Sequence, residues 1–111
     1  MDKIIIQGGH RLHGEVPVAG AKNAALPILI ATILAPGEHI LRSVPELNDI
    51  STMLSLLGRL GCPSLVAPGR VRLDTSRVSF TEAPYDLVRK MRASVLALGP
   101  LLARKGAAIR P

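Results

Sequence analysis

The sequence predicts an α/β fold, in which short strands alternate with helices. Runs rich in β-branched residues alternate with longer apolar segments of helical length. Glycine and proline pairs separate most of these segments. The chain has 111 residues, of which 48% are apolar and 20% are charged, as is typical of a globular domain. Only Phe80 and Tyr85 are aromatic, so we expect a core of aliphatic side chains.

The first strands and the first helix follow from local composition. We expect strands at residues 3–7 and 13–18, each rich in isoleucine or valine. Residues 21–35 are rich in alanine, leucine and isoleucine and predict a helix, with Pro27 near its first turn, where a missing N–H costs little. Pro36-Gly37 then ends the helix.

The middle of the chain predicts a strand, an amphipathic helix and a hairpin. A strand is expected at residues 39–43. Residues 48–60 predict the helix, with Asn48 or Asp49 as its N-cap. Residues 64–67 and 70–74 predict two strands joined by a turn. The helix carries apolar residues spaced by three and four positions: Ile50, Met53, Leu54, Leu57 and Leu60.

The last third of the chain predicts an extended piece and a helical region. The extended piece covers residues 78–81, and the helical region covers residues 85–105. Gly99-Pro100 is expected to kink this region, and Gly106 to cap its C-terminus. The predicted order is therefore one βαβαββ unit followed by the opening helix of another.

A net charge of +6 favours anionic partners. Nucleic acid is disfavoured, because aromatic side chains that stack on bases are nearly absent. The cations are also scattered, apart from Arg89, Lys90 and Arg92. A basic nucleic-acid-binding protein stays as an alternative, which strongly salt-dependent DNA binding would reveal.

Composition also bears on the compartment. The longest apolar run, residues 24–35, is too short to span a bilayer as a helix, so no membrane partner is expected. Cys62 is the one cysteine, which excludes a disulfide framework within the chain and suits a reducing cytosol. We therefore expect a cytoplasmic protein, in which Cys62 is a small buried apolar residue.

The most informative segment reads Gly-Ala-Lys-Asn-Ala-Ala-Leu-Pro at residues 20–27. It follows a predicted strand and opens a predicted helix, where free backbone N–H groups favour anions. Lys22 would add an ammonium there, and Asn23 a side chain that both donates and accepts hydrogen bonds. The segment predicts a small anion site, although an ordinary helix start with an exposed lysine fits the spacing equally well.

The same segment resembles a signature of the UDP-N-acetylglucosamine enolpyruvyl transferases. Other segments resemble that family in the same order: the opening Met-Asp-Lys-Ile, Gly-Glu-Val at residues 14–16, and Val-Pro followed by leucine, aspartate and isoleucine within residues 44–50. Residues 83–94, which end in Arg-Lys-Met-Arg-Ala-Ser, and Leu-Gly-Pro-Leu at 98–101 continue the resemblance to about residue 106.

The resemblance implies an activity and its substrates. The family transfers an enolpyruvyl group from phosphoenolpyruvate to the 3-hydroxyl of UDP-N-acetylglucosamine in peptidoglycan synthesis, releasing phosphate through a tetrahedral intermediate, without an organic cofactor. Lys22 and Asn23 match the family residues that meet phosphoenolpyruvate, and Arg92 matches the arginine that meets the anionic substrates, UDP-N-acetylglucosamine among them. Arg89, three residues before Arg92, is a weaker candidate, which a solvated basic face explains as well.

The resemblance also implies a fold and a domain division. The family fold is an inside-out α/β barrel of two domains built from βαβαββ units. Residues 1–19 would join the second domain, and residues 20–111 would form an incomplete first domain. Residues 3–18 would then lack sheet partners within this chain.

Several family features are not found in this sequence. The family's cysteine-bearing loop and catalytic aspartate have no match, and Cys62 lies elsewhere, so we assign no catalytic residue. We therefore expect the chain alone to be inactive and to need the remainder of the enzyme chain as a partner. A non-catalytic anion-binding module is the alternative. No metal site is expected either, because His10, His13 and His39 lack a convincing further ligand.

Overall fold

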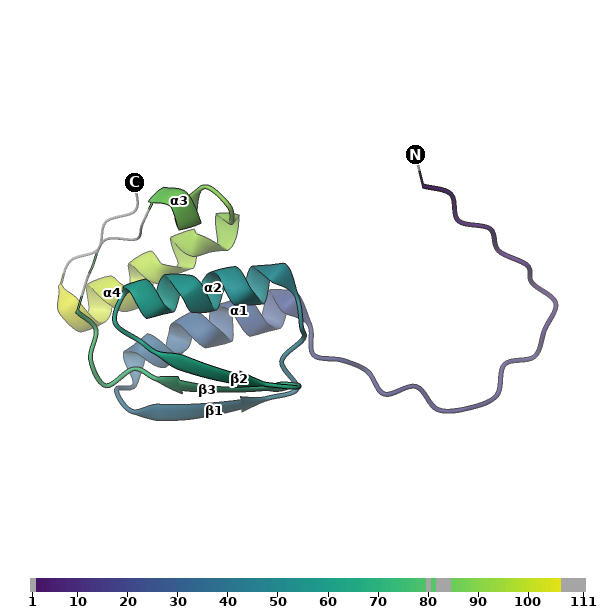
Figure 1. Ribbon diagram of the computed structural model, residues 1–111, viewed down its shortest axis with the longest axis horizontal. Helices are drawn as coiled ribbons and strands as arrows, with labels where there is room; N and C mark the ends of the chain where they lie inside the picture. Colours follow the sequence, from purple (N-terminus) through teal and green to yellow (C-terminus); the bar gives the residue numbers. More distant parts are fainter. Residues whose placement is uncertain (1, 80, 82–84, 107–111) are drawn as a thin grey trace.

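In the computed structural model, which describes residues 2–79, 81 and 85–106, a body of helices and strands carries a long N-terminal arm (Figure 1). Residues 2–19, which we call the arm, are all exposed and form no helix or strand. The predicted strands at 3–7 and 13–18 are therefore wrong for this chain. A strand needs a hydrogen-bonded neighbour, and the arm has none. That residues 1–19 join a second domain stays a prediction.

The body begins with α1 (Lys22–Ala31), which passes into the short 3₁₀ helix η1 (Thr32–Leu34). Pro27 is the sixth residue of α1, so the prediction that it lies near the first turn is wrong. The proline has no N–H and leaves the backbone carbonyl of Asn23 without its helical donor. The helix tolerates this because Leu26, Leu29 and Ile30 are buried on its inner side.

The sheet has three strands in the order β1-β3-β2, all of them antiparallel to their neighbours. The strands are β1 (Glu38–Arg42), β2 (Ser64–Ala67) and β3 (Arg70–Asp74). The hairpin predicted at residues 64–74 is confirmed as the β2–β3 pair. Val71 and Leu73 of β3 are buried, whereas Arg70, Arg72 and Asp74, which alternate with them, are exposed, so the helices cover one face of the sheet only.

The helix α2 (Asn48–Arg59) connects β1 to β2 and carries the predicted apolar stripe. Its N-cap is Leu47, without a side-chain cap, so the prediction that Asn48 or Asp49 caps it is wrong. Both residues instead lie in the first turn. Gly61 follows the helix with φ of +105°, and a Cβ there would lie 2.8 Å from the backbone nitrogen of Ser79.

The C-terminal segment consists of three short helical pieces: α3 (Tyr85–Val88), η2 (Arg92–Ala97) and α4 (Leu98–Lys105). The predicted kink at Gly99-Pro100 is wrong, because these residues lie in the first turn of α4. The break lies instead at Met91, which is extended at φ −151° and ψ 119°. Gly106 caps α4 in the left-handed conformation at φ of 75°, as predicted. Residues 78, 79 and 81 form no strand; Phe80, within that predicted piece, lies outside the described residues.

Aliphatic side chains fill the space between the helices and the inner face of the sheet. α1 packs against both α2 and η2. No helix in the described part of the chain is long and apolar enough to cross a membrane. The most deeply buried large side chains of the core are Leu29, Ile30, Ile33, Met53, Leu56, Leu57, Leu60, Leu73 and Leu101.

Arg104 ties the last helix to the rest of the body. Its guanidinium donates to the backbone carbonyl of Ile33 at 3.2 Å, to that of Ser76 at 2.8 Å, and to that of Thr75. These carbonyls belong to η1 and to the chain leaving β3. One half-buried side chain therefore joins three segments that are far apart in sequence.

Replacing Arg104 with alanine should lower the free energy of unfolding by about 1–3 kcal/mol, because charge-assisted hydrogen bonds are lost and their carbonyls are left unpaired. Urea denaturation followed by circular dichroism measures this. Lys105→Ala is the matched control, since Lys105 is exposed in the same helical turn; it should change stability by less than about 0.5 kcal/mol. Equal effects of the two variants would contradict the role given to Arg104.

Candidate site at the shared end of the helices

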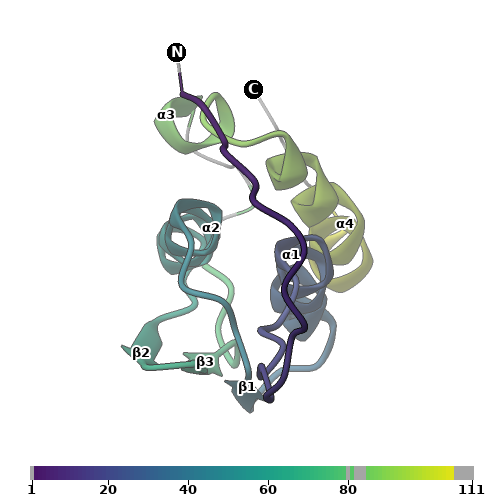
Figure 2. The ribbon, with the colours of Figure 1, turned by 90° about the vertical axis from the view of Figure 1, so that its right-hand side faces the viewer.

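Three helical segments begin at the same end of the body. The colour order in Figure 1 shows that α1, α2 and the η2–α4 segment run in the same direction, and Figure 2 views the molecule from the end where they start. The first N–H groups of a helix lack partners within it, and the helix dipole makes this end positive. None of the three segments has a side-chain N-cap. This end of the molecule is therefore suited to anions.

Lys22 is the first residue of α1. Its Nζ lies 3.1 Å from Oδ2 of Asp49, which belongs to the first turn of α2. The side chain of Lys22 is 44% exposed and that of Asp49 is 40% exposed, so the ammonium remains open to a ligand from solvent. The pair joins the beginnings of the two helices that cover the sheet.

Asn23 follows as the second residue of α1, and its side chain is exposed. Because Pro27 lacks an N–H, the Asn23 backbone carbonyl is also free of its usual helical bond. Asn23 therefore offers an amide that donates and accepts, next to the Lys22 ammonium. The structure thus places Lys22 and Asn23 side by side at an open helix start, as the sequence predicted for the segment.

Gly20 fixes the position of this helix start. A Cβ at residue 20 would lie 1.9 Å from the backbone oxygen of Ser43 and 3.4 Å from Cδ of Pro45. Ser43 itself has φ of +57°, which is uncommon for a residue other than glycine. The chain entering α1 therefore packs directly on the loop between β1 and α2, and that loop leads into the first turn of α2, where Asp49 lies close to Lys22.

Arg92 is the first residue of η2, and it is exposed. Since η2 packs against α1, the structure brings the Arg92-bearing segment against the Lys22-bearing helix. Arg89 lies in the turn after α3, where its backbone N–H donates to Tyr85 at 3.0 Å. Within the described residues, neither arginine forms an ion pair. Both guanidinium groups can therefore meet an anion, although Arg92 alone begins a helical segment.

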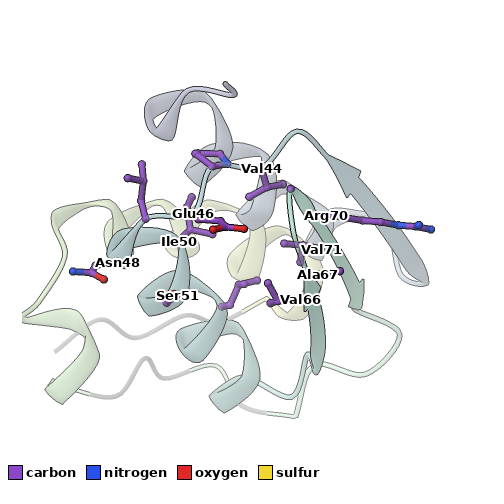
Figure 3. Close-up of a pocket in the computed structure, with 13 residues that line it drawn as sticks. Val44, Glu46, Asn48, Ile50, Ser51, Val66, Ala67, Arg70 and Val71 are labelled. Atoms are coloured by element: carbon purple, nitrogen blue, oxygen red, sulfur yellow. The ribbon is translucent and has the colours of Figure 1, made fainter. Parts of the chain in front are cut away.

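Two open pockets lie beside this end. One, of about 260 Å³, lies between the start of α1 and the end of β1; its lining is mainly apolar and includes Ala21, Ile28 and Leu41. The other, of similar size, lies between the start of α2 and the hairpin (Figure 3). Arg70 lines its rim but is directed away from it in Figure 3, so the pocket gains no inward cation from that side chain.

Cys62 lies away from this end and is fully buried, as predicted. Burial raises the pKa of its thiol, and the carboxylate of Asp74 adds to that shift while Arg104 opposes it. The thiol is therefore neutral at physiological pH and shielded from ligands. His39 bonds to the Ala35 carbonyl through Nε2 at 2.7 Å, whereas His10 and His13 lie on the exposed arm. Among the described residues, no three metal-binding side chains come together.

Asp49 is the residue of this end that sequence reasoning did not assign to the site. An acidic residue in the first turn of a predicted helix indicates only a favourable interaction with the helix dipole. Its pairing with Lys22 depends on how α1 and α2 pack, which the local pattern does not contain.

A protein-family model described as EPSP synthase (3-phosphoshikimate 1-carboxyvinyltransferase) matches residues 6–110 of the chain. The chain belongs to this family. The UDP-N-acetylglucosamine 1-carboxyvinyltransferase of Anaeromyxobacter dehalogenans (strain 2CP-C) is 55% identical over 111 residues, which cover 97% of this chain and 26% of that protein. The enzyme of the same name from Geobacter metallireducens is 56% identical over 108 residues, with the same two coverages.

The chain thus spans about a quarter of the length of these curated relatives. Among solved structures, the enolpyruvyl transferase NikO from Streptomyces tendae matches with a TM-score of 0.77 at 24% identity, over 91% of this chain and 24% of NikO. The predicted family resemblance and α/β fold class are confirmed: the body is an α/β fragment of the enolpyruvyl transferase fold.

Replacing Gly20 with alanine should lower the free energy of unfolding by about 1–3 kcal/mol, because the new Cβ overlaps the Ser43 carbonyl and must displace the start of α1. Thermal or urea unfolding measures the loss. Gly8→Ala is the matched control, since Gly8 lies on the arm with nothing within 4 Å of a Cβ. If Gly20→Ala were as stable as Gly8→Ala, the close packing at this helix start would be refuted.

Proposed function

We propose that this chain supplies part of the substrate site of a UDP-N-acetylglucosamine 1-carboxyvinyltransferase. The proposed reaction transfers the enolpyruvyl group of phosphoenolpyruvate to the 3-hydroxyl of UDP-N-acetylglucosamine and releases phosphate, as the first committed step of peptidoglycan synthesis, in the cytoplasm. The observation that carries the proposal is the convergence of three helix starts with Lys22, Asn23 and Arg92 at one end of the body. The names of the relatives at 55% and 56% identity supply the substrate class.

Each proposed residue has a role that follows from its chemistry. Lys22 and Asn23 bind phosphoenolpyruvate, because an ammonium and an amide at an open helix start complement its phosphate and carboxylate. Arg92 binds UDP-N-acetylglucosamine, since a guanidinium grips phosphate oxygens through two parallel hydrogen bonds. Arg89 is a secondary contact, because it begins no helix and lies in a turn.

The arrangement suits a reaction in which negative charge moves between substrates. Fixed cations and helix starts stabilise charge without having to reorganise during the reaction. A mechanism through a tetrahedral adduct needs an acid that donates a proton to the methylene carbon of phosphoenolpyruvate. Cys62 cannot supply it, because its thiol is buried in the core. The 111-residue chain is therefore proposed to bind substrate anions without completing the reaction.

Binding tests the first half of the proposal. Phosphoenolpyruvate added to ¹⁵N-labelled protein should shift the amide resonances of Lys22 and Asn23 most strongly in nuclear magnetic resonance spectra, and UDP-N-acetylglucosamine should shift that of Arg92. Lys22→Ala should weaken this binding about tenfold, because a hydrogen bond to a charged group contributes about 1.5–3 kcal/mol. The control variant Lys105→Ala, at the C-terminal end of α4, should bind phosphoenolpyruvate as the unsubstituted chain does. Shifts centred elsewhere, or an unchanged affinity of the Lys22 variant, would refute the assignment.

Turnover tests the second half. With phosphoenolpyruvate and UDP-N-acetylglucosamine both present, the 111-residue chain should release no phosphate above the level of its Lys22→Ala variant. A phosphate assay with purified protein measures this directly. Release that requires the sugar nucleotide and is abolished in the variant would show that the chain holds an acid other than a loop cysteine, contrary to the proposal.

A further inference from the structure

We infer that Asp49 is a positioning residue that aims the Lys22 ammonium at the anion site. The inference rests on the proposed function, in which Lys22 binds phosphoenolpyruvate, and it adds a residue that acts through Lys22. The distance of 3.1 Å between Nζ of Lys22 and Oδ2 of Asp49 carries it. This is an ion pair between the beginnings of two separate helices.

The pair leaves the ammonium available. A lysine ammonium has three donors, and the carboxylate oxygen of Asp49 occupies one of them. The Lys22 side chain remains 44% exposed, so the other two donors can reach a ligand. Without a partner, a lysine side chain samples many rotamers on a flexible stem. Asp49 therefore selects the rotamers that hold the charge over the shared helix starts.

The position and the charge of the Asp49 carboxylate are both favoured by the helix that carries it. It lies in the first turn of α2, where the positive helix end favours a negative charge. The backbone before α2 is fixed as well, because the Ser43 carbonyl packs against Gly20 and the N–H of Val44 donates to Gly69 at 3.2 Å. The backbones of both residues are thus set by the fold, but the side chain of Asp49 is short whereas that of Lys22 is long and flexible, so Asp49 is the member of the pair that orients the other.

The chain offers a matched control pair. Arg59 and Asp86 also join two helices, with an N–O distance of 3.7 Å, and Asp86 lies in the first turn of α3. Arg59 is the last residue of α2 and Asp49 is its second, so the two pairs lie at opposite ends of the same helix. Removing either carboxylate deletes one exposed ion pair and one first-turn charge, but only Asp49 faces Lys22.

A double-mutant cycle tests the inference. In the 111-residue protein, Asp49→Ala should weaken phosphoenolpyruvate binding by about two- to fivefold, the range that exposed ion pairs span, measured by nuclear magnetic resonance titration. Asp86→Ala should leave the affinity unchanged. In a Lys22→Ala background, Asp49→Ala should have no further effect, because its action passes through the missing ammonium. A merely structural role would persist in that background.

The outcomes separate the inference from the proposed function. If Asp49→Ala leaves the affinity unchanged or raises it while Lys22→Ala lowers it, Asp49 does not position Lys22 and the inference is overturned, whereas the proposed function stands. A full effect of Asp49→Ala in the Lys22→Ala background also overturns it. If Lys22→Ala does not weaken binding at all, the proposed function fails first, and the inference fails with it.

Discussion

The architecture depends on one constraint: aliphatic side chains must be buried between two parallel helices and a single face of a small sheet. The chain has almost no aromatic residues, so leucine, isoleucine, valine and methionine supply nearly all the apolar surface. Such a core stabilises the body only if α1 and α2 both lie flat on the inner face of the sheet. In the chain, β1 runs back along the body between α1 and α2, so both helices begin at the same end and Lys22 meets Asp49 there.

A small network of buried hydrogen bonds supplements the apolar core. The hydroxyl of Thr75, which is fully buried, lies 2.9 Å from the carbonyl of Thr32 and 3.1 Å from that of Ala35, where η1 ends. The carbonyl of Thr75 in turn accepts from Arg104. Buried carbonyls at the end of a helix need such partners. This network joins α4, which directly follows η2, to η1 and to the chain leaving β3.

The sequence patterns correctly predicted those elements that neighbouring residues alone specify. The stripe on α2 and the turn between β2 and β3 were found because periodicity and turn residues specify them without distant contacts. The arm was predicted to form strands because Ile4, Ile5 and Ile6 favour extended backbone, yet a strand also requires a neighbour, which the described residues do not supply. Pro27 was misplaced because packing on the core outweighs one lost hydrogen bond.

In the proposed site, too, some features follow from neighbouring residues and others depend on tertiary packing. The helix start that carries Lys22 and Asn23 could be predicted from the segment around them, whereas the role of these residues in an anion site stays a prediction. The ion pair of Lys22 with Asp49 could not be predicted, because it spans two helices that only the tertiary packing brings together. The break at Met91, after which Arg92 begins a new helical segment, lies well before Gly99-Pro100, where the kink was predicted.

The common direction of the helices has an energetic consequence for the fold. Neighbouring helices that run antiparallel offset each other's dipoles, whereas parallel ones repel at each end, so this arrangement keeps a standing electrostatic strain. Asp49 relieves part of it on α2, but α1 and η2 begin without an acidic residue in their first turn. The fold itself therefore polarises this end of the body, and the proposed site would offer an anion a field that is already present rather than one assembled around it.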